Sequence, residues 1–237
     1  MEIIKQYGLE RTGTNYIKAL LEYNLEDSRV LSNMFGLKHE KYIKPNLVTY
    51  NPNTDKNVIT DIPPGQIAAI KNKFINKEIY YVIIIKNPYS WVISYNNCQW
   101  IAANNGPLNK DKINRYIKRW NTVNKDWIDN ILKPNTDKSF GVFYNDLISQ
   151  PDVIIKMISE KFNIPISPVF KNINNLMVPG TDVCSSKNIS GAIFNKKDYY
   201  LNEGYMKEIH PQFIEIINNS IDNDIIKYFN KWSIMSL

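Results

Sequence analysis

An unbroken apolar run, Ile79–Ile85, constrains the fold more than any other stretch of this chain. Its sequence, IYYVIII, consists of β-branched and aromatic residues with no polar residue between them. Such a run is typical of a strand that is covered on both faces, as in a parallel sheet. Pro88 follows at a position that suits the first turn of a helix. We therefore expect a buried parallel strand that leads directly into a helix.

Further strand and helix patterns alternate along the chain. Apolar runs predict strands at Ile3–Tyr7 and Ser139–Tyr144, and Leu31–His39 is ambiguous but could include a short strand. Apolar residues at helical spacing predict helices at Thr14–Tyr23, Gln66–Phe74, Pro88–Trp100, Asp111–Leu132 (as one helix or two), Asp152–Phe162 and Pro211–Phe229. Strands that alternate with helices imply a parallel sheet with helices on both faces. Loop-like composition marks Asn51–Pro64 and Pro165–Gly204.

Composition excludes several classes of protein. The chain has 237 residues, 43% of them hydrophobic and 22% charged, which is ordinary for a globular protein. No stretch approaches the ~18 apolar residues of a membrane span. Glu2 and Lys5 interrupt any signal peptide, so we expect a soluble cytoplasmic protein. Without a composition shift or an internal repeat, residues 1–237 are expected to form one domain.

Cysteine, histidine and charge usage narrow the chemistry further. Cys98 and Cys184 do not make a disulfide framework and are interpreted as free thiols. His39 and His210 lack ligand-type spacing, so no metal centre is expected. The net charge of +6 suits an anionic ligand. The lysine excess also fits an AT-rich coding sequence, so we do not take it as a sign of a nucleic-acid partner.

The loop after the first predicted strand has the form of a phosphate-binding loop. Residues 7–17 read YGLERTGTNYI, and Gly8 and Gly13 have the spacing of the motif G-x-x-x-x-G-K-[ST]. Thr14 stands where the motif's lysine belongs, and Asn15 stands where its Mg²⁺ ligand belongs. A helix N-terminus with Arg11 beside it attracts anions without a metal. The alternative is that Thr14 merely caps the helix and Gly13 makes a tight turn.

A second candidate site follows the strand at Ile79–Ile85. Lys86 ends that strand, and Ser94 lies eight residues further on, about two helical turns away. Ligands of open parallel sheets bind at such strand ends. Lys86 and Ser94 could therefore hold a second phosphate. The alternative is a solvated strand-end charge beside an ordinary helix serine.

Together these motifs resemble those of the sulfotransferases. ERTGTNY resembles their 5′-phosphosulfate loop, KNPYSWVIS resembles their 3′-phosphate motif, and FYNDLISQP resembles their Y-E-D-L segment. The resemblance covers roughly residues 1–165. It departs from the family pattern at Lys86, where Arg is usual, and at Asn145, where Glu is usual. The C-terminal glycine-rich nucleotide loop has its best counterpart in Ser185–Gly191, SSKNISG.

The resemblance implies a P-loop-like α/β three-layer sandwich. It also implies 3′-phosphoadenosine 5′-phosphosulfate as the donor, whose sulfuryl transfer requires no Mg²⁺ bridge. The residues implied to bind the donor are Arg11, Thr12, Gly13, Thr14, Asn15, Tyr16, Lys86, Ser94 and Lys187. It further implies that the catalytic base lies in a K-H element just past the second strand.

That element is Lys38-His39, followed by Glu40. His39 is the expected base, because an imidazole suits proton removal from an acceptor hydroxyl. Lys38 or Arg11 would stabilise charge on the departing phosphate oxygen. Glu40 is the alternative base. A solvated surface run is the structural alternative for the whole segment.

The acceptor is not readable from the sequence. Basic residues and aromatics interleave on one predicted helix, which suits an anionic or sugar-like acceptor or a nucleic acid. The more common alternative is a solvated helix face with its aromatics in the core. The residues are Lys110, Lys112, Arg115, Tyr116, Lys118, Arg119 and Trp120. Trp91 and Tyr95 are similarly either adenine-pocket or core residues. We therefore predict a sulfotransferase that acts on a hydroxyl or amine of a small molecule or carbohydrate. The alternatives are a nucleotide or nucleoside kinase with a degenerate P-loop, and a non-catalytic module that binds an anionic polymer.

Overall fold

The computed structural model describes residues 1–34, 36–42, 64–98, 106–172 and 197–234. The candidate nucleotide loop Ser185–Gly191, with Lys187, lies outside the described residues, as do Cys184, Trp100 and nearly all of the loop expected at Asn51–Pro64.

The described strands form one parallel sheet in the order β2-β1-β3-β4. They are β1 (Glu2–Tyr7), β2 (Ser28–Leu31), β3 (Tyr80–Ile85) and β4 (Ser139–Phe143). All three pairings are parallel, and β1 pairs with β2 on one side and with β3 on the other. The buried run Ile79–Ile85 therefore supplies a central strand, as its composition predicts.

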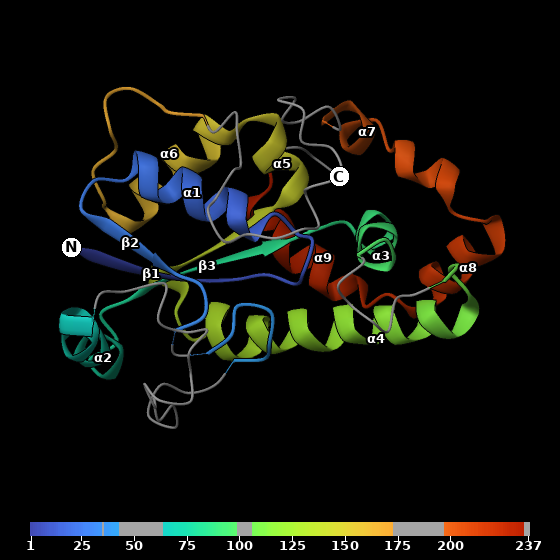
Figure 1. Ribbon diagram of the computed structural model, residues 1–237, viewed down its shortest axis with the longest axis horizontal. Helices are drawn as coiled ribbons and strands as arrows, with labels where there is room; N and C mark the ends of the chain where they lie inside the picture. The colour runs from blue at the N-terminus through green and yellow to red at the C-terminus, as the bar shows by residue number, and fades with distance from the viewer. Residues whose placement is uncertain (35, 43–63, 99–105, 173–196, 235–237) are drawn as a thin grey trace.

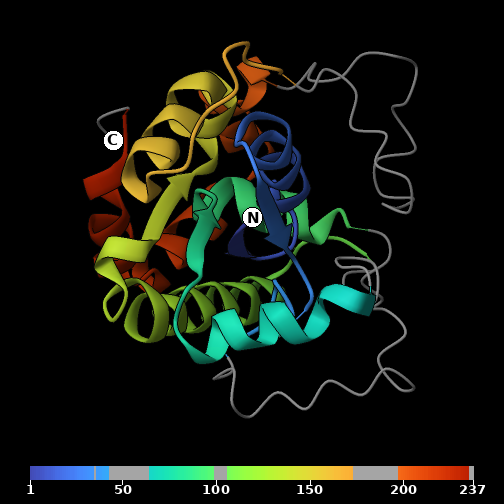
Figure 2. The same cartoon turned by 90° about the vertical axis from the view of Figure 1, so that its left-hand side faces the viewer.

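Helices cover both faces of the sheet, and Figure 1 shows α1 and α6 on the side opposite the long helix α4. The longer helices are α1 (Thr14–Asn24), α2 (Ile67–Ile75), α3 (Pro88–Asn96), α4 (Lys110–Trp127), α6 (Pro151–Phe162) and α8 (Pro211–Ser220). The shorter ones are α5 (Tyr144–Ser149), α7 (Lys197–Leu201) and α9 (Asn223–Phe229). Figure 2 shows the sheet nearly end-on between these two layers. The chain thus has the predicted α/β architecture. Within the described residues, no helix is long and apolar enough to cross a membrane.

Alternate residues of β3 face two separate hydrophobic cores. Tyr81, Ile83 and Ile85 pack with residues of α2, α3, α4 and α9, whereas Val82 and Ile84 pack with residues of α1, α5 and α6. Because successive side chains of a strand point to opposite faces, a strand between two cores must be apolar at every position. This double burial explains why the IYYVIII run shows no alternation.

Several element boundaries differ from the sequence predictions. The second strand ends at Leu31 rather than lying within Leu31–His39, and Pro165–Gly204 contains the helix α7. The helix expected over Pro211–Phe229 is two helices, because the side chain of Asp222 caps a new N-terminus at α9. α4 continues into one π-helical turn, Ile128–Leu132, so the stretch from 111 to 132 is nearly continuous.

Gly141 in β4 offers a direct test of the packing on this sheet. A Cβ added there would lie 2.4 Å from Trp232 Cε3 and 2.8 Å from Phe229 Cδ1. We predict that Gly141→Ala lowers the free energy of unfolding by about 1–3 kcal/mol, because a packed core resists an added methyl group. Urea unfolding measures this change. Gly65→Ala is the control, since nothing lies within 4 Å of its added Cβ. Equal stability of the two variants would contradict the packing described here.

Candidate anion-binding site

The site lies where the strand order changes direction within the parallel sheet, next to β1. β1 connects through α1 to β2 on one side, while β3 pairs with β1 on the other, with Tyr7 opposite Ile83. The loops after β1 and β3 consequently leave the same edge of the sheet side by side. This edge is the switch point at which open parallel sheets bind their ligands.

The loop after β1 is shaped by close contacts that require glycine. Gly8 approaches β3 so closely that an added Cβ would lie 2.6 Å from Ile84 Cγ2. Gly13 has φ +87°, and its Cβ would lie 2.8 Å from the Tyr144 ring. Thr12 is buried, and its hydroxyl donates to the carbonyl of Leu9 at 2.7 Å. The loop is therefore folded tightly against the sheet.

Gly13 occupies the N-cap position of α1, which contradicts the alternative that Thr14 caps this helix. Thr14 is the first helical residue and is buried. Since glycine has no side chain to bond the first N–H groups, the N-terminus of α1 keeps the character of an anion site. Arg11, whose side chain is exposed, stands beside it.

Lys86 is buried, which contradicts the alternative of a solvated strand-end charge. Its side chain is 1% exposed, and its Nζ donates to Ser94 Oγ at 2.9 Å. The ammonium also lies 3.9 Å from the centre of the Tyr200 ring and 4.6 Å from that of the Tyr144 ring. The carbonyl oxygen of Arg11 is 3.5 Å from the same nitrogen. The structure thus brings the two sequence motifs together at one ammonium group.

Two tyrosines at Lys86 were missed by the sequence reasoning. Tyr144 belongs to the Y-E-D-L-like segment, where only its family resemblance was noted. Tyr200 comes from α7, and its hydroxyl lies 3.3 Å from Ser94 Oγ although the two residues are 106 positions apart. No local pattern signals so distant a contact. Tyr144 was within reach of prediction, because it follows a strand adjacent to that of Lys86.

Lys38 and His39 lie against the loop after β1. Gly8 N–H donates to the carbonyl of Lys38 at 2.9 Å, and His39 Nδ1 lies 2.5 Å from the carbonyl oxygen of Gly8. Lys38 Nζ donates to Asn15 Oδ1 at 2.7 Å, at the start of α1. The candidate base is therefore held beside the candidate anion site, and not on a solvated run.

The contact with Gly8 fixes the tautomer of His39. A carbonyl oxygen only accepts hydrogen bonds, so Nδ1 must carry the proton and Nε2 keeps its lone pair. The pKa of His39 is lowered to about 3, mainly by burial and also by the positive charges of Lys38, Arg119 and Lys5, whereas the bond to Gly8 opposes the shift. The imidazole is consequently neutral near pH 7, with Nε2 available to accept a proton.

The basic helix does not present its aromatics to an acceptor. In α4, Tyr116 and Trp120 are at most 1% exposed and belong to the core, as do Trp91 and Tyr95 of α3. Lys112 is also buried, whereas Lys110, Arg115 and Lys118 are exposed. Arg119 turns toward His39 instead, and its Nη2 lies 3.0 Å from that residue's carbonyl oxygen. The core alternative is thus the correct one for these aromatics.

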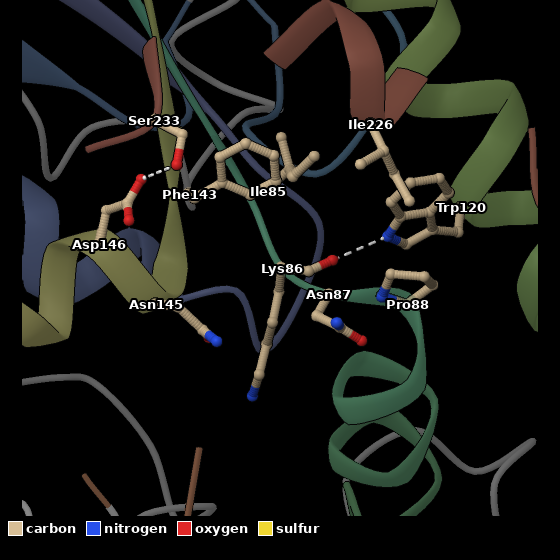
Figure 3. Close-up of a pocket in the computed structure, with 10 residues that line it drawn as sticks. All are labelled: Ile85, Lys86, Asn87, Pro88, Trp120, Phe143, Asn145, Asp146, Ile226 and Ser233. Carbon is tan, nitrogen blue, oxygen red and sulfur yellow. Dashed lines mark hydrogen bonds between the residues drawn. The ribbon is translucent and has the colours of Figure 1, made fainter. Parts of the chain in front are cut away.

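A small cavity lies behind Lys86 at the carboxyl ends of β3 and β4 (Figure 3). Its volume is about 50 Å³, enough for a few water molecules but far too small for a nucleotide. Trp120 Nε1 closes one side by donating to the carbonyl of Lys86 at 3.1 Å. Asp146 on the other side accepts from the hydroxyl of Ser233 at 2.9 Å. This cavity is therefore not a nucleotide site.

The described residues include no group of three or more His, Cys, Asp or Glu side chains placed to hold a metal ion. The polar groups gathered at the switch point are instead cations and hydroxyls: Arg11, Lys38, Lys86, Thr12 and Ser94.

Comparisons with known proteins agree with this geometry at the level of the fold. No family model matches the sequence, and a search of curated proteins found no match. A mouse sulfotransferase, SULT7A1 complexed with PAP, aligns with a TM-score of 0.53 at 13% identity, over 98% of this chain and 89% of its own. A sulfotransferase domain from the curacin biosynthetic pathway aligns with a TM-score of 0.42 at 12% identity, over 92% of this chain and 96% of its own. A sulfotransferase domain from the Synechococcus PCC 7002 olefin synthase aligns with a TM-score of 0.44 at 12% identity, over 92% of this chain and 93% of its own. The alignment with SULT7A1 shows that the chain has the sulfotransferase fold.

The proton affinity of His39 tests the electrostatics of this site. We predict that His39 stays neutral down to about pH 4, and that Lys38→Met raises its pKa because a neighbouring positive charge is removed. Imidazole carbon and proton shifts followed by NMR across pH 3–8 measure both. The chain has two histidines, and the spectrum of His210→Gln identifies the signals. A midpoint for His39 near the ordinary value of ~6.5 would contradict the lowered pKa expected from its surroundings.

Proposed function

We propose that this protein is a sulfotransferase that moves a sulfuryl group from 3′-phosphoadenosine 5′-phosphosulfate to a hydroxyl or amine of a small-molecule or carbohydrate acceptor. The observation that carries the proposal is the convergence of two anion-binding elements at one switch point. Lys86 and Ser94 meet at 2.9 Å, and the carbonyl of Arg11 in the other loop lies 3.5 Å from the same ammonium. The fold likeness to a sulfotransferase complexed with PAP supports it.

The residues at the switch point fit an anionic nucleotide. Lys86 is a buried cation beside the hydroxyl of Ser94 and the rings of Tyr144 and Tyr200. A positive charge at this edge of the sheet attracts an anionic group such as a phosphate. At the other loop, Gly13 leaves the N-terminus of α1 uncapped by a side chain, with Arg11 and Lys38 nearby. Two separate anionic groups are what a nucleotide with a 3′-phosphate and a 5′-phosphosulfate offers.

In this proposal, separate residues of the chain bind the donor, remove the proton and stabilise the leaving group. When bound, the donor supplies an activated sulfuryl group on a phosphate leaving group. Arg11 and the N-terminus of α1 would hold the 5′ end, while Lys86 and Ser94 would hold the 3′-phosphate. His39 Nε2 would take the proton of the acceptor hydroxyl. Lys38, bonded to Asn15 at the start of α1, stabilises the negative charge left on the phosphate oxygen.

The low proton affinity of His39 is consistent with a base that acts in the bound state. Burial is the largest cause of the low pKa of His39, and the positive charges of Lys38 and Arg119 lower it further. An anionic group bound beside Lys38 offsets the positive charge of that lysine. A nearby negative charge also favours the protonated imidazole, so it raises the pKa of His39. His39 is therefore expected to become a stronger base once the donor is bound.

Nucleotide titration tests the donor assignment. We expect 3′-phosphoadenosine 5′-phosphate to bind in calorimetry without metal. Arg11→Ala and Ser94→Ala should weaken binding by about 10-fold to 100-fold, since each removes a hydrogen bond to a charged group worth ~1.5–3 kcal/mol. Lys110→Ala, an exposed cation on α4, is the charge-matched control for Arg11.

The alternatives predict different titrations. A preference for ATP with Mg²⁺ would overturn the proposal in favour of a kinase, despite Thr14 at the lysine position of the loop. Tight binding of a sulfated polymer without any bisphosphate binding would favour the non-catalytic module.

Turnover tests the base. With a panel of carbohydrate and phenolic acceptors, release of the bisphosphate from the sulfate donor should fall by about 10²-fold to 10⁴-fold in His39→Ala. Its affinity for the bisphosphate should stay close to that of the unmodified protein. If His39→Ala and His39→Gln both keep full activity, His39 is not the base; Glu40→Gln is then the variant to compare.

A further inference from the structure

We propose that Arg119 is a positioning residue, which locks the phosphate loop after β1 to the segment that carries His39. The role of His39 as a base rests on the proposed function, but the lock itself is a property of the folded chain. The sequence placed Arg119 with the acceptor-facing charges of α4. The structure points it in the opposite direction, into the junction between two loops.

One nitrogen of the guanidinium contacts both loops. Arg119 Nη2 lies 2.9 Å from Glu10 Oε1 and 3.0 Å from the carbonyl oxygen of His39. It also lies 3.4 Å from Glu40 Oε1. Glu10 directly precedes Arg11, and Glu40 directly follows His39. The single cation therefore holds the neighbours of the candidate anion ligand and of the candidate base.

Two indole groups reinforce this junction from the same layer of helices. Trp91 Nε1 donates to the carbonyl of Glu10 at 2.7 Å, and Trp127 Nε1 donates to the carbonyl of Glu40 at 2.9 Å. Both indoles are buried and cannot shift without disturbing the core. Glu10 and Glu40 are thus fixed through their main chains by tryptophan and through their side chains by Arg119.

The electrostatics indicate that this pair orders the site more than it stabilises the fold. Burial raises the pKa of Glu10 despite the opposing charge of Arg119. Glu10 Oε2 and Arg119 Nε are both buried without a hydrogen-bond partner among the described residues. A pair that leaves such atoms unsatisfied gives little net stability, because desolvation offsets the attraction. What it fixes is geometry: the loop after β1 cannot separate from the His39 segment while the pair is intact.

The consequence for catalysis is a fixed distance between the bound donor and the base. His39 Nδ1 already contacts the carbonyl of Gly8 at the start of the same loop. Arg119 holds the other side of the His39 main chain. Movement of a reacting group by about 1 Å costs roughly 10²-fold in rate. Arg119 therefore acts through His39 and does not need to touch the donor or acceptor.

The test is the tautomer of His39, read by long-range ¹H–¹⁵N NMR of the two imidazoles of the full chain. We expect the unmodified protein to show one Nδ1–H tautomer, and Arg119→Gln to show a mixture of tautomers as the segment loosens from Gly8. Arg119→Lys should restore the single tautomer, because one charged nitrogen makes all three contacts. Arg115→Gln, on an exposed part of the same helix, is the control and should match the unmodified protein.

A second variant keeps the test decisive if a buried, unpaired Glu10 prevents Arg119→Gln from folding. The double variant Glu10→Gln/Arg119→Gln removes both charges together and should show the same mixed tautomers. An unchanged His39 spectrum in a folded Arg119→Gln or double variant would overturn the proposal. Where turnover is measured, Arg119→Gln should lower kcat by about 10²-fold and leave bisphosphate affinity nearly unchanged. The tautomer reading does not depend on nucleotide binding, so failure of the proposed function and failure of this inference are separate results.

Discussion

The burial of the Lys86 ammonium at the end of β3 is the constraint on which the arrangement of the site depends. Removing a charge from water is costly unless other groups replace the lost solvation. Ser94 supplies a hydrogen bond at 2.9 Å, and the rings of Tyr144 and Tyr200 supply two aromatic faces. These groups come from three separate parts of the chain. Their convergence ties α3, α5 and α7 to the carboxyl end of the sheet.

The same region explains why glycine recurs in the loop after β1. Tyr144 can approach Lys86 only by lying against Gly13, where even a Cβ would come within 2.8 Å of its ring. Gly8 in turn allows the loop to lie directly on β3. In nucleotide triphosphate-binding loops, a lysine of the loop itself supplies the charge. Here Thr14 stands at that position, and the buried cation comes from the neighbouring strand.

Local patterns in the sequence were sufficient for much of this arrangement. The IYYVIII run predicted the central strand. The eight-residue spacing of Lys86 and Ser94 indicated that both could face one ligand, but it left a solvated strand-end lysine as the alternative. The contacts of Tyr200 with Ser94 and of Arg119 with Glu10 span 106 and 109 residues, and no periodicity encodes them. The aromatics of α4 were ambiguous for a related reason. Helical spacing shows that Tyr116 and Trp120 share a face, but only packing shows that this face is the core.

The packing around position 86 is compatible with lysine, where the motif that this segment resembles usually has arginine. An arginine fork binds a phosphate through two nitrogens but needs room for a planar group. The Lys86 nitrogen sits 3.9 Å and 4.6 Å from two ring centres, a space suited to a compact ammonium. Cation–π contacts of this kind contribute about 0.5–2 kcal/mol and retain the full positive charge. The positive charge at position 86 is therefore held in place by the rings of Tyr144 and Tyr200.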